Sequence, residues 1–373
     1  MAKANAKTKA LDSVDPVLLI DVLVLTLLGL IMVYSASSVV SYEDYGDSAY
    51  FFKKQLVWAF LGIIAAGFFM VYEPEKMKKL IPFFLLVSVI MLFMVHVPGF
   101  GKKAGGAVRW LKLPGLPQIQ PFEFVKLFYA MYLAFLFSDV KLPFKKIFMK
   151  SLMVTGIICF GLILQRDLGG TFIIMALFII MTLISGAPLK IFALTIPAAA
   201  LVVAALIIAE PYRVKRMFVY LDPWKDYFGA GWQTAQSLIA IGTGGIFGMG
   251  LSQGQQKFLY LPTPHTDYIY SIVGEETGFI GAALVAAMFF VFLWRGSAIA
   301  INAKDRFLKL LACSVTFMIG VQAFTNMGVA TGILPPKGTT LPFFSAGGSS
   351  LLISLMAAGI LLGVSRKVFG EGK

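Results

Sequence analysis

Residues 259–276 read LYLPTPHTDYIYSIVGEE and lie where a long polar, glycine-rich segment gives way to an apolar helix. Pro262 and Pro264 end any helix before them, because proline lacks a backbone N–H and clashes with the preceding turn. His265 and Asp267 follow at once, and the apolar run begins directly after them. An ionisable side chain at the mouth of a membrane helix is costly, so Asp267 is the first candidate for a functional residue.

The composition predicts a membrane protein. The chain has 373 residues, of which 58% are hydrophobic and 14% are charged, whereas about a quarter of a soluble domain is charged. Its apolar runs are continuous rather than alternating, which favours several transmembrane helices over a membrane β-barrel. Cys159 and Cys313 lie inside apolar runs and are interpreted as packing residues, and two distant histidines argue against a histidine-based metal site.

The apolar runs also predict a topology. An even number of spans places both termini on one side of the membrane, and the short basic turns and tails on that side predict that it is the cytoplasm. We therefore expect one all-α, polytopic transmembrane domain over 1–373, with a cytoplasmic tail at 1–16 and a large extracytoplasmic loop at 210–267 between the seventh and eighth helices. The ten expected spans are 17–39, 54–72, 80–97, 121–138, 147–165, 170–186, 188–209, 268–293, 307–331 and 347–365.

The loop at 98–120 lies on the outer face in this topology and contains many Gly and Pro residues, which predict a shaped backbone rather than a helix. It carries Arg109 beside Trp110, which fit either an anchor pair at the membrane interface or a phosphate-binding arginine next to a sugar-stacking indole. Gln120 is the expected cap of the fourth span. Glu123 and Lys126 follow three residues apart, on one helix face, and are expected to pair.

Other outer segments carry further candidate residues. Asp167 stands where the chain turns between the fifth and sixth spans, and its simplest role is to cap the sixth span. The glycine cluster at 242–250 predicts that the backbone there approaches another group closely. Residues 232–241 fit an amphipathic helix lying on the membrane. Residues 347–350 (GGSS) at a helix start fit either a serine cap or an anion site, and Lys337 adds a nearby cation.

Together these outer segments resemble the SEDS family (shape, elongation, division and sporulation) over nearly the whole chain. Residues 265–270 (HTDYIY) and 274–276 (GEE) resemble the family's hallmark near the eighth span, and residues 337–343 (KGTTLPF) with 347–350 resemble its last outer loop. Each piece alone is weak, and their order and spacing make the resemblance specific. Shorter matching pieces are Ala107-x-Arg109-Trp110, Gln120-Pro121-x-Glu123-x-x-Lys126, Gln165-x-Asp167-Leu168-Gly169, Pro211-Tyr212-Arg213-x-x-Arg216 and Asp222-Pro223-Trp224.

The resemblance has departures and favours one branch. The Lys-Gly-x-Thr-Leu-Pro form at 337–342 is more similar to the division branch, FtsW, than to the elongation branch, RodA. Arg166 stands where the family usually has proline, Ala346 where it has tyrosine, Phe122 where it has serine, and Val108 where it has arginine.

The resemblance implies a peptidoglycan glycosyltransferase in the bacterial cytoplasmic membrane. Such an enzyme polymerises lipid II on the outer leaflet into β-1,4 glycan strands and releases undecaprenyl diphosphate. It works with a class B penicillin-binding protein, a single-span transpeptidase, and with other membrane proteins of cell division. No nucleic acid partner is expected, and the formal net charge of +13 suits anionic lipids or an anionic substrate.

The residue types suit this chemistry. Diphosphate is a good leaving group, so the reaction needs a base for the acceptor hydroxyl and cations or N–H groups for the leaving charge. Asp267 is the expected base of an inverting displacement, and Mg²⁺ or Mn²⁺ held by carboxylates is an alternative or additional source of positive charge. Substrate-binding residues are expected to be Arg109, Trp110, Gln120, Glu123, Lys126, Asp167, His265, Lys337 and Ser349.

Three neighbours of Asp267 are weaker candidates for the base. At 100° per residue, Glu276 points to the opposite side of the helix from Asp267 and Glu275 about 80° away, so both are expected to be internal polar ties. His265 fits a structural loop residue better than a base. A lipid flippase would also need many spans, but the charged residues gather at the outer mouth rather than at the bilayer midplane. A scaffold that only recruits partners would leave the outer polar residues unexplained.

Overall fold

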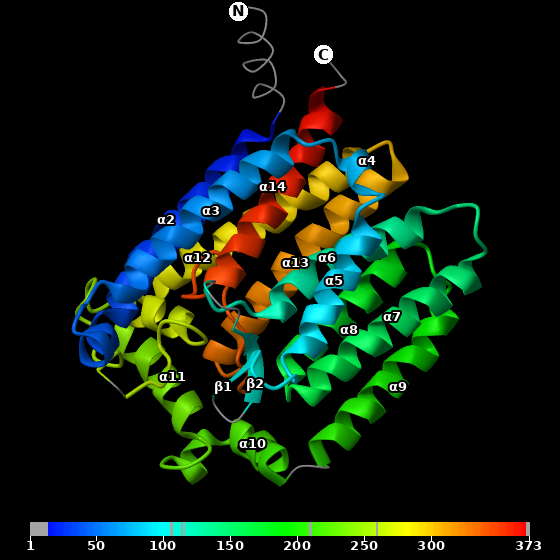
Figure 1. Ribbon diagram of the computed structural model, residues 1–373. Helices are drawn as coiled ribbons and strands as arrows, with labels where there is room; N and C mark the ends of the chain where they lie inside the picture. The colour runs from blue at the N-terminus through cyan, green and yellow to red at the C-terminus, as the bar shows by residue number, and fades with distance from the viewer. Residues whose placement is uncertain are drawn as a thin grey trace, which may run out of the picture.

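The computed structural model describes residues 14–104, 107–112, 115, 117–208, 211–258 and 260–370. It is a bundle of long helices with one small hairpin (Figure 1). Of the predicted cytoplasmic tail at 1–16, residues 1–13 lie outside the described residues. The helices are α2 (Pro16–Tyr45), α3 (Tyr50–Val71), α4 (Pro74–Met77), α5 (Ile81–Met94), α6 (Pro121–Ser138), α7 (Phe144–Leu164), α8 (Leu168–Ile184), α9 (Leu189–Ile208), α10 (Pro211–Leu221), the 3-10 helix η1 (Pro223–Asp226), α11 (Trp232–Gly244), α12 (Ile269–Asn302), α13 (Arg306–Ala330) and α14 (Gly348–Gly370).

The prediction of a polytopic all-α membrane protein is confirmed. Each of the ten expected spans coincides with a helix. Within the described residues, seven helices are long and apolar enough to cross a membrane, and α5 and α8 are shorter apolar helices. The helices α2 and α12 run further than their apolar stretches predict, because helical hydrogen bonding continues into polar residues. A left-handed glycine, Gly46 with φ of 70°, then ends α2.

The ends of the described chain lie on the same side of the bundle, at the top of Figure 1. The Asp15 backbone N–H, at the start of α2, donates to the Ser365 hydroxyl of α14 at 3.2 Å. The Asp15 carboxylate pairs with Arg295 near the end of α12 at 2.5 Å. This arrangement agrees with an even number of spans, while the cytoplasmic placement of this end stays a prediction.

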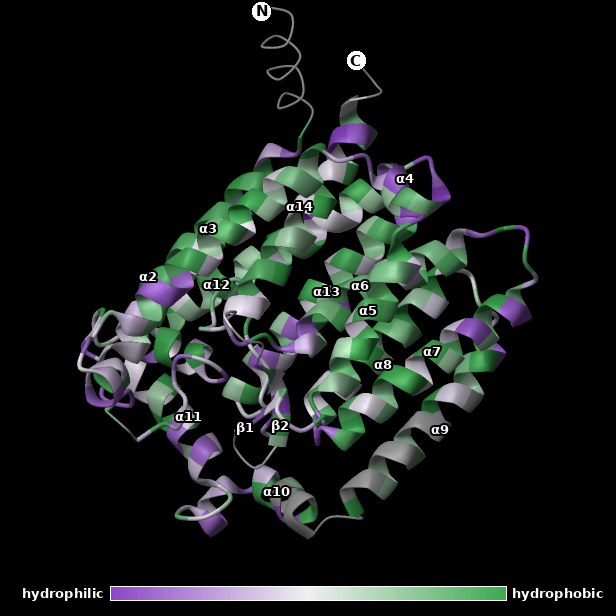
Figure 2. Ribbon diagram, viewed as in Figure 1, coloured by the Kyte–Doolittle hydropathy of each residue, from purple (hydrophilic) through white to green (hydrophobic). Residues whose placement is uncertain are grey.

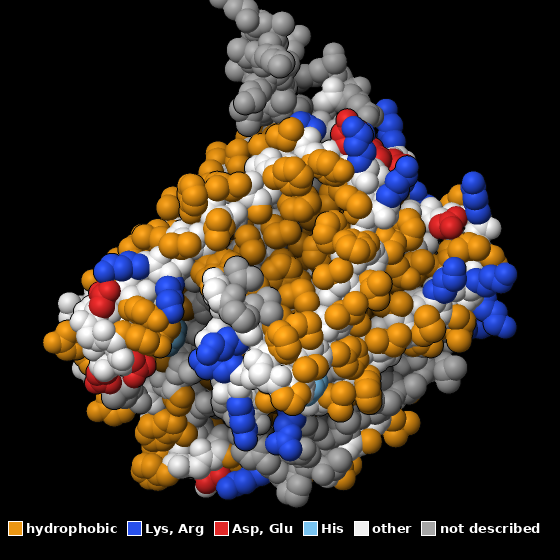
Figure 3. All heavy atoms as spheres, in the orientation of Figure 1, with side chains coloured by type: hydrophobic (Ala, Val, Ile, Leu, Met, Phe, Trp, Pro, Cys, Tyr) orange, Lys and Arg blue, Asp and Glu red, His pale blue; other side chains and the backbone are white. Residues whose placement is uncertain are grey.

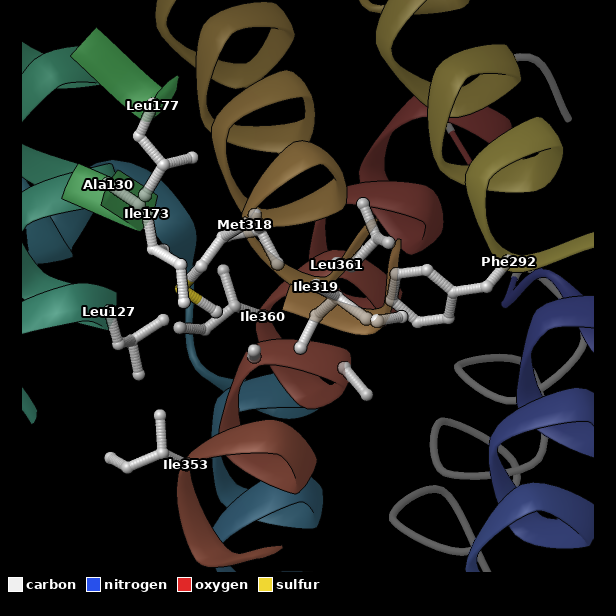
Figure 4. Close-up of a cluster of buried hydrophobic side chains, with 14 of the residues drawn as sticks. Leu127, Ala130, Ile173, Leu177, Phe292, Met318, Ile319, Ile353, Ile360 and Leu361 are labelled. Atoms are coloured by element: carbon white, nitrogen blue, oxygen red, sulfur yellow. The ribbon is translucent and has the colours of Figure 1, made fainter. Parts of the chain in front are cut away.

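The core lies around α13, α14 and α6, and helices α2, α3, α5 and α7 carry the lipid-facing surface. Figure 2 shows these outer helices as mostly hydrophobic, and in Figure 3 a broad band of apolar side chains separates regions richer in Lys and Arg. Large apolar side chains such as Ile20 and Phe60 are 60% and 65% exposed, as expected for contact with acyl chains. Side chains from five helices meet in the core in Figure 4: Leu127, Ala130, Ile173, Leu177, Phe292, Met318, Ile319, Ile353, Ile360 and Leu361.

The 98–120 segment contains regular structure that the sequence does not predict. Strands β1 (Gly101–Ala104) and β2 (Ala107–Leu111) form an antiparallel hairpin with an irregular register after Lys102. Leu111 exchanges two backbone hydrogen bonds with Ile119, at 2.8 and 3.1 Å, which ties the hairpin to the chain that enters α6. The segment is therefore non-helical here, as expected, and the strand pairing is the part that the sequence does not predict. Pairing across a short turn satisfies backbone groups that Gly and Pro leave outside a helix.

The 210–267 segment holds α10, η1 and α11. The helix predicted at 232–241 is confirmed as α11, but its buried face contacts protein rather than the membrane alone. The Ser237 hydroxyl lies 2.5 Å from the Ser271 hydroxyl of α12 and donates to the Ala330 carbonyl of α13 at 2.7 Å. These contacts hold the segment against the ends of two core helices.

Helix α12 is broken at Gly278, where φ is 68° and ψ is −169°. The segment 245–250 fills the break. Its Met249 and Gly250 N–H groups donate to the Glu275 and Glu276 carbonyls, both at 3.0 Å, and the Gly245 and Ile246 carbonyls accept from Phe279 and Ile280 at 2.8 and 3.2 Å. A Cβ at Gly248 would lie 2.3 Å from the Glu276 carbonyl oxygen, so the close approach predicted for the glycine cluster is confirmed.

Candidate active site

A polar cavity of about 340 Å³ opens between β2, the starts of α6, α8 and α14, and the two loops before α12 and α14. Seven of the predicted site residues line it, and Lys126, His265 and Lys337 are not among its lining residues. The seven are Arg109, Trp110, Gln120, Glu123, Asp167, Asp267 and Ser349. The fold thus brings together side chains from four segments that are far apart in the sequence. The hairpin beside this cavity lies away from the end of the bundle that holds both termini (Figure 1).

The Asp267 carboxylate lies against Gly338, in the loop that precedes α14. A Cβ built on Gly338 would lie 3.0 Å from Asp267 Oδ2 and 3.9 Å from Arg109 Nη1, so a side chain there would crowd both groups. Glycine at 338 therefore leaves room for a carboxylate and a guanidinium at the cavity wall.

The surroundings of Asp267 change its acidity. Burial is the largest effect and raises the pKa of this carboxyl group from 3.8 to about 6. The Arg109 guanidinium opposes this effect and lowers the pKa, while the Asp167 carboxylate raises it. A carboxylate with a pKa near neutrality accepts a proton more readily than an ordinary aspartate, as a general base requires.

Arg109 is anchored to the turn between α7 and α8. Its Nε donates to the Gln165 carbonyl at 3.3 Å and its Nη2 to the Arg166 carbonyl at 2.6 Å. Two of its nitrogens therefore hold hairpin and turn together, while Nη1 faces the region of Asp267. These bonds make Arg109 part of the cavity wall, with one edge of the guanidinium directed to the site.

The turn between α7 and α8 has the capping geometry that the sequence predicts. Asp167 Oδ1 accepts from the Gly170 N–H at 2.9 Å, so Asp167 caps α8. Gln165 Nε2 donates to the Leu92 carbonyl at 2.7 Å and fixes the turn to α5. Arg166 has φ of 56°, which a proline ring cannot adopt, so the arginine at this usual proline position accompanies a different backbone.

A chain of buried hydrogen bonds connects α6, α13 and the start of α14 next to the cavity. Lys126 Nζ donates to Glu123 Oε2 at 2.6 Å and to Gln322 Oε1, which confirms the predicted pair. Gln322 Nε2 donates to the Thr340 carbonyl and hydroxyl at 2.9 and 3.0 Å, and the Thr340 hydroxyl lies 2.8 Å from that of Ser350. Lys126 is fully buried, so it acts on the cavity through Glu123 and Gln322 rather than by reaching into it.

The start of α14 forms one wall of the cavity. Ser349 Oγ accepts from the Gln120 N–H at 3.2 Å, and the Gly347 N–H donates to Gln55 Oε1 at 3.2 Å. The first N–H groups of any helix lack intrahelical acceptors, and Gly347, Ser349 and Ser350 all line the cavity. Gln120 stands at the cap position of α6, but its side chain makes no cap bond, which corrects that detail of the prediction.

His265 and Lys337 lie beside the cavity. The His265 ring stacks on Phe51 with centroids 4.6 Å apart, and burial lowers the pKa of this histidine to about 4, so the ring is neutral near pH 7. Lys337 Nζ lies 4.2 Å from the centre of the Phe172 ring, and burial lowers the pKa of Lys337 while the Asp167 carboxylate opposes that shift. A neutral, stacked His265 fits the structural role better than that of a base.

Glu275 and Glu276 lie just before the break in α12 and form polar contacts inside the protein, as predicted. Glu276 accepts from the Ser35 hydroxyl of α2 at 2.6 Å and from Lys257 Nζ at 2.9 Å. Glu275 accepts from the N–H groups of Gln255 and Gln256 at 2.6 and 3.1 Å. Neither glutamate lines the cavity.

The sequence interpretation missed the polar residues of α13. Gln322 and Asn326 stand four residues apart inside an otherwise apolar helix, so they lie on one face. Gln322 lines the cavity, and Asn326 contacts the backbone of Asp267. Buried amides at this spacing in a membrane helix are a signal that could have revealed both.

The donor set was also tested as a metal site. Among the described residues, no three His, Cys, Asp or Glu side chains are arranged to hold a metal ion. Mg²⁺ is commonly held by one or two carboxylates together with substrate phosphates. Asp167 and Asp267 would supply those carboxylates in this cavity.

Comparisons with known proteins identify the family. The family model for the cell cycle proteins FtsW, RodA and SpoVE matches residues 16–369. The chain belongs to this family. It is 43% identical to the probable peptidoglycan glycosyltransferase FtsW of Trichlorobacter lovleyi, over 98% of this chain and 96% of that protein. It is 40% identical to stage V sporulation protein E of Bacillus subtilis, over 95% of this chain and 97% of that protein.

Solved structures share the fold of this FtsW/RodA/SpoVE family member. A chain from a peptidoglycan synthase complex that coordinates polymerization and crosslinking is 27% identical, with a TM-score of 0.78 over 95% of this chain and 98% of that chain. The Thermus thermophilus rod shape determining protein RodA is 25% identical, with a TM-score of 0.69 over the same shares. The chain is thus a multi-pass membrane protein whose relatives act in cell-wall synthesis.

Proposed function

We propose that this chain is a division-type peptidoglycan glycosyltransferase in which Asp267 is the general base. The activity class follows from the family and from relatives at about 40% identity that are probable glycosyltransferases of the FtsW type. The observation that carries the assignment of the base is the position of Asp267. Its carboxylate lines a polar cavity next to Arg109, and burial raises its pKa to about 6.

The reaction follows from these groups. Asp267 takes the proton of the acceptor sugar hydroxyl, and that oxygen attacks the anomeric carbon of the donor. The bond from this carbon to the diphosphate breaks, and its electron pair leaves with undecaprenyl diphosphate. A single displacement inverts the anomeric centre, needs one base, and forms the β-1,4 link of a glycan strand made from lipid II.

Positive groups in the cavity wall suit the leaving diphosphate. Arg109 and the residues at the start of α14 around Ser349 line the cavity and would stabilise the developing charge. Trp110 and Gln120 line the same cavity and would contact the sugars. Lys126 would hold Glu123 and Gln322 in place, and a Mg²⁺ or Mn²⁺ ion carried in with the diphosphate would add positive charge beside Asp167.

The proposal includes a location and partners. The cavity lies away from the end of the bundle that holds both termini, so cytoplasmic termini would place it at the outer face of the bacterial cytoplasmic membrane. Lipid II would reach it from the outer leaflet. The fold shared with a chain of a complex that couples polymerization to crosslinking supports a transpeptidase partner of the class B penicillin-binding type, together with other division proteins.

The rival function is a lipid II flippase. Transporters place their charged groups near the bilayer midplane, whereas Asp267 and Asp167 lie just before α12 and α8, and Arg109 lies in β2, outside the long helices. A second alternative is a polymerase of the elongation type. Relatives at about 40% identity that are named FtsW favour the division type, although one solved relative is a RodA.

Purified protein incubated with lipid II, alone and with a class B transpeptidase, tests this function. We expect polymeric glycan strands on a gel. A parallel assay follows transfer of lipid II between leaflets of sealed vesicles. Leaflet transfer without polymer would overturn the enzyme assignment, and an inactive protein in both assays, with a folded melting profile, would support a scaffold instead.

A further inference from the structure

We propose that Asn326 is a positioning residue that holds Asp267 in its reactive place, an inference that rests on the proposed role of Asp267 as base. Asn326 lies on α13 and is fully buried. Its Nδ2 donates to the Asp267 carbonyl at 2.8 Å and to the Thr339 carbonyl at 2.6 Å. One amide therefore bridges the loop that carries the base and the loop that contains Gly338.

This bridge fixes the geometry that matters for the base. The Asp267 carboxylate lies against Gly338, and Asn326 binds the backbone of Asp267 on one side and of Thr339 on the other. Both N–H groups of its side chain are used in this way. A loss of the bridge would let the two loops separate, and a shift of about 1 Å at a reacting group costs about 10²-fold in rate.

The carbonyl groups of the whole 265–267 turn are held in a row. The His265 carbonyl accepts from the Ala346 N–H at 2.8 Å, and the Thr266 carbonyl accepts from the Ser345 hydroxyl at 2.6 Å. Asn326 holds the third carbonyl, that of Asp267. The first two bonds come from the loop before α14, whereas the third comes from the body of a core helix.

The Asn326 side chain uses its donors but not its acceptor. Asn326 Oδ1 is buried and accepts no hydrogen bond among the described residues, which costs stability in a buried site. An apolar side chain at this position would have no such unpaired oxygen. The retention of an amide at this cost is what a role in holding two carbonyls explains.

The experiment compares Asn326→Leu with Thr325→Val. Leucine has the same number and branching of side-chain heavy atoms, is larger, and has no donor. Thr325 is the neighbouring residue and is 2% exposed. Among the described residues its hydroxyl donates only to the Val321 carbonyl of its own helix, at 2.7 Å, so Thr325→Val removes a buried polar group without touching the site. We expect Asn326→Leu to lower kcat at least tenfold with little change in KM for lipid II, and Thr325→Val to keep both.

The pH profile separates positioning from general destabilisation. Charged groups around Asp267 are Arg109 from β2, Asp167 before α8, and Glu123 on α6 across the cavity. Burial is the largest cause of the raised pKa of Asp267, so a loosened Asp267 becomes more hydrated and its pKa falls. The acid limb of kcat/KM in Asn326→Leu should therefore lie at least half a pH unit below that of the parent protein and of Thr325→Val.

Two outcomes overturn the inference. One is an unchanged kcat in Asn326→Leu, and the other is a lower kcat with an unmoved acid limb, which would indicate a purely structural role. If Asn326→Leu fails to fold, Asn326→Ala decides, since it also removes both donors and adds no bulk, and activity equal to that of Thr325→Val would refute positioning. Activity in Asp267→Asn would instead overturn the proposed base, so the two failures are distinguishable.

Discussion

Asp267 and Glu276 belong to one sequence motif, but their surroundings differ. Asp267 lies just before α12, and Glu276 lies near the end of the short outer piece of that helix. Glu276 is 1% exposed, and its oxygens accept from the Ser35 hydroxyl and from Lys257 Nζ, itself 2% exposed. Asp267 lines a cavity, and within the described part of the chain its carboxylate forms no ion pair. A carboxylate with a full set of partners holds helices together, whereas one that faces a cavity with a raised pKa is available for chemistry.

Substitution of the cavity carboxylate gives the largest effect on activity. Asp267→Asn keeps the size of the side chain and removes the base, so we expect polymerisation of lipid II to fall by about 10²–10⁴-fold. The melting temperature should be unchanged or higher, because a buried charge is removed. Glycan gels and a thermal melt in detergent measure the two quantities. A variant that still polymerises at the parent rate would break the comparison.

Substitution of the paired carboxylate should act mainly on stability. Lys257→Met leaves the Glu276 charge buried with only hydroxyl partners, and loss of one member of a buried pair costs about 3–5 kcal/mol. The double variant Lys257→Met with Glu276→Leu removes both charges and should melt closer to the parent protein. Equal melting of the parent and the single variant would show that the pair is not structural.

The glycine at the break in α12 gives a smaller effect of the same kind. Gly278→Ala places a Cβ 2.3 Å from the Gly248 N–H and forces a side chain into a left-handed φ, which costs about 1–3 kcal/mol. Gly67→Ala on α3 is the control, because a Cβ there meets nothing within 4 Å. We expect a lower melting temperature for the first variant only. An unchanged melting temperature of Gly278→Ala would argue against the close packing of segment 245–250 at the break.

Neighbouring charges sharpen the comparison through the pH profile. The native pKa of Asp267, about 6, predicts that kcat/KM falls below pH 6 as the base becomes protonated. Arg109 lowers this pKa and Asp167 raises it. Arg109→Ala should therefore move the acid limb to higher pH, and Asp167→Asn should move it to lower pH while its amide oxygen still caps α8.

The two shifts must have opposite signs. Shifts in one direction, or none, would mean that another group sets the acid limb. A weaker apparent affinity of Arg109→Ala for lipid II would in addition support its contact with the diphosphate, and an unchanged affinity would leave Arg109 as an anchor between the hairpin and the turn.

The sequence alone reveals the helices, the outer segments and Asp267, because apolar run length and proline placement are local signals. The pairing of Glu123 with Lys126 and the cap by Asp167 are also local, and both are confirmed. The hairpin and the buried place of Lys126 are not predicted, since they depend on contacts between distant segments. Asn326 was missed for the same reason, as its two acceptors come from loops on either side of α13.

The break at Gly278 divides α12 into a long piece that could span the membrane and a short outer piece next to Asp267. The part of α12 from Phe279 to Asn302 is about 36 Å long at 1.5 Å per residue, which already crosses a hydrocarbon layer about 30 Å thick. The outer piece from Ile269 to the break adds about 14 Å of helix. In the proposed topology Asp267, which precedes this piece, would lie near the headgroups. A prenyl tail could stay among the acyl chains while its sugars meet the carboxylate, without any part of the lipid leaving the membrane.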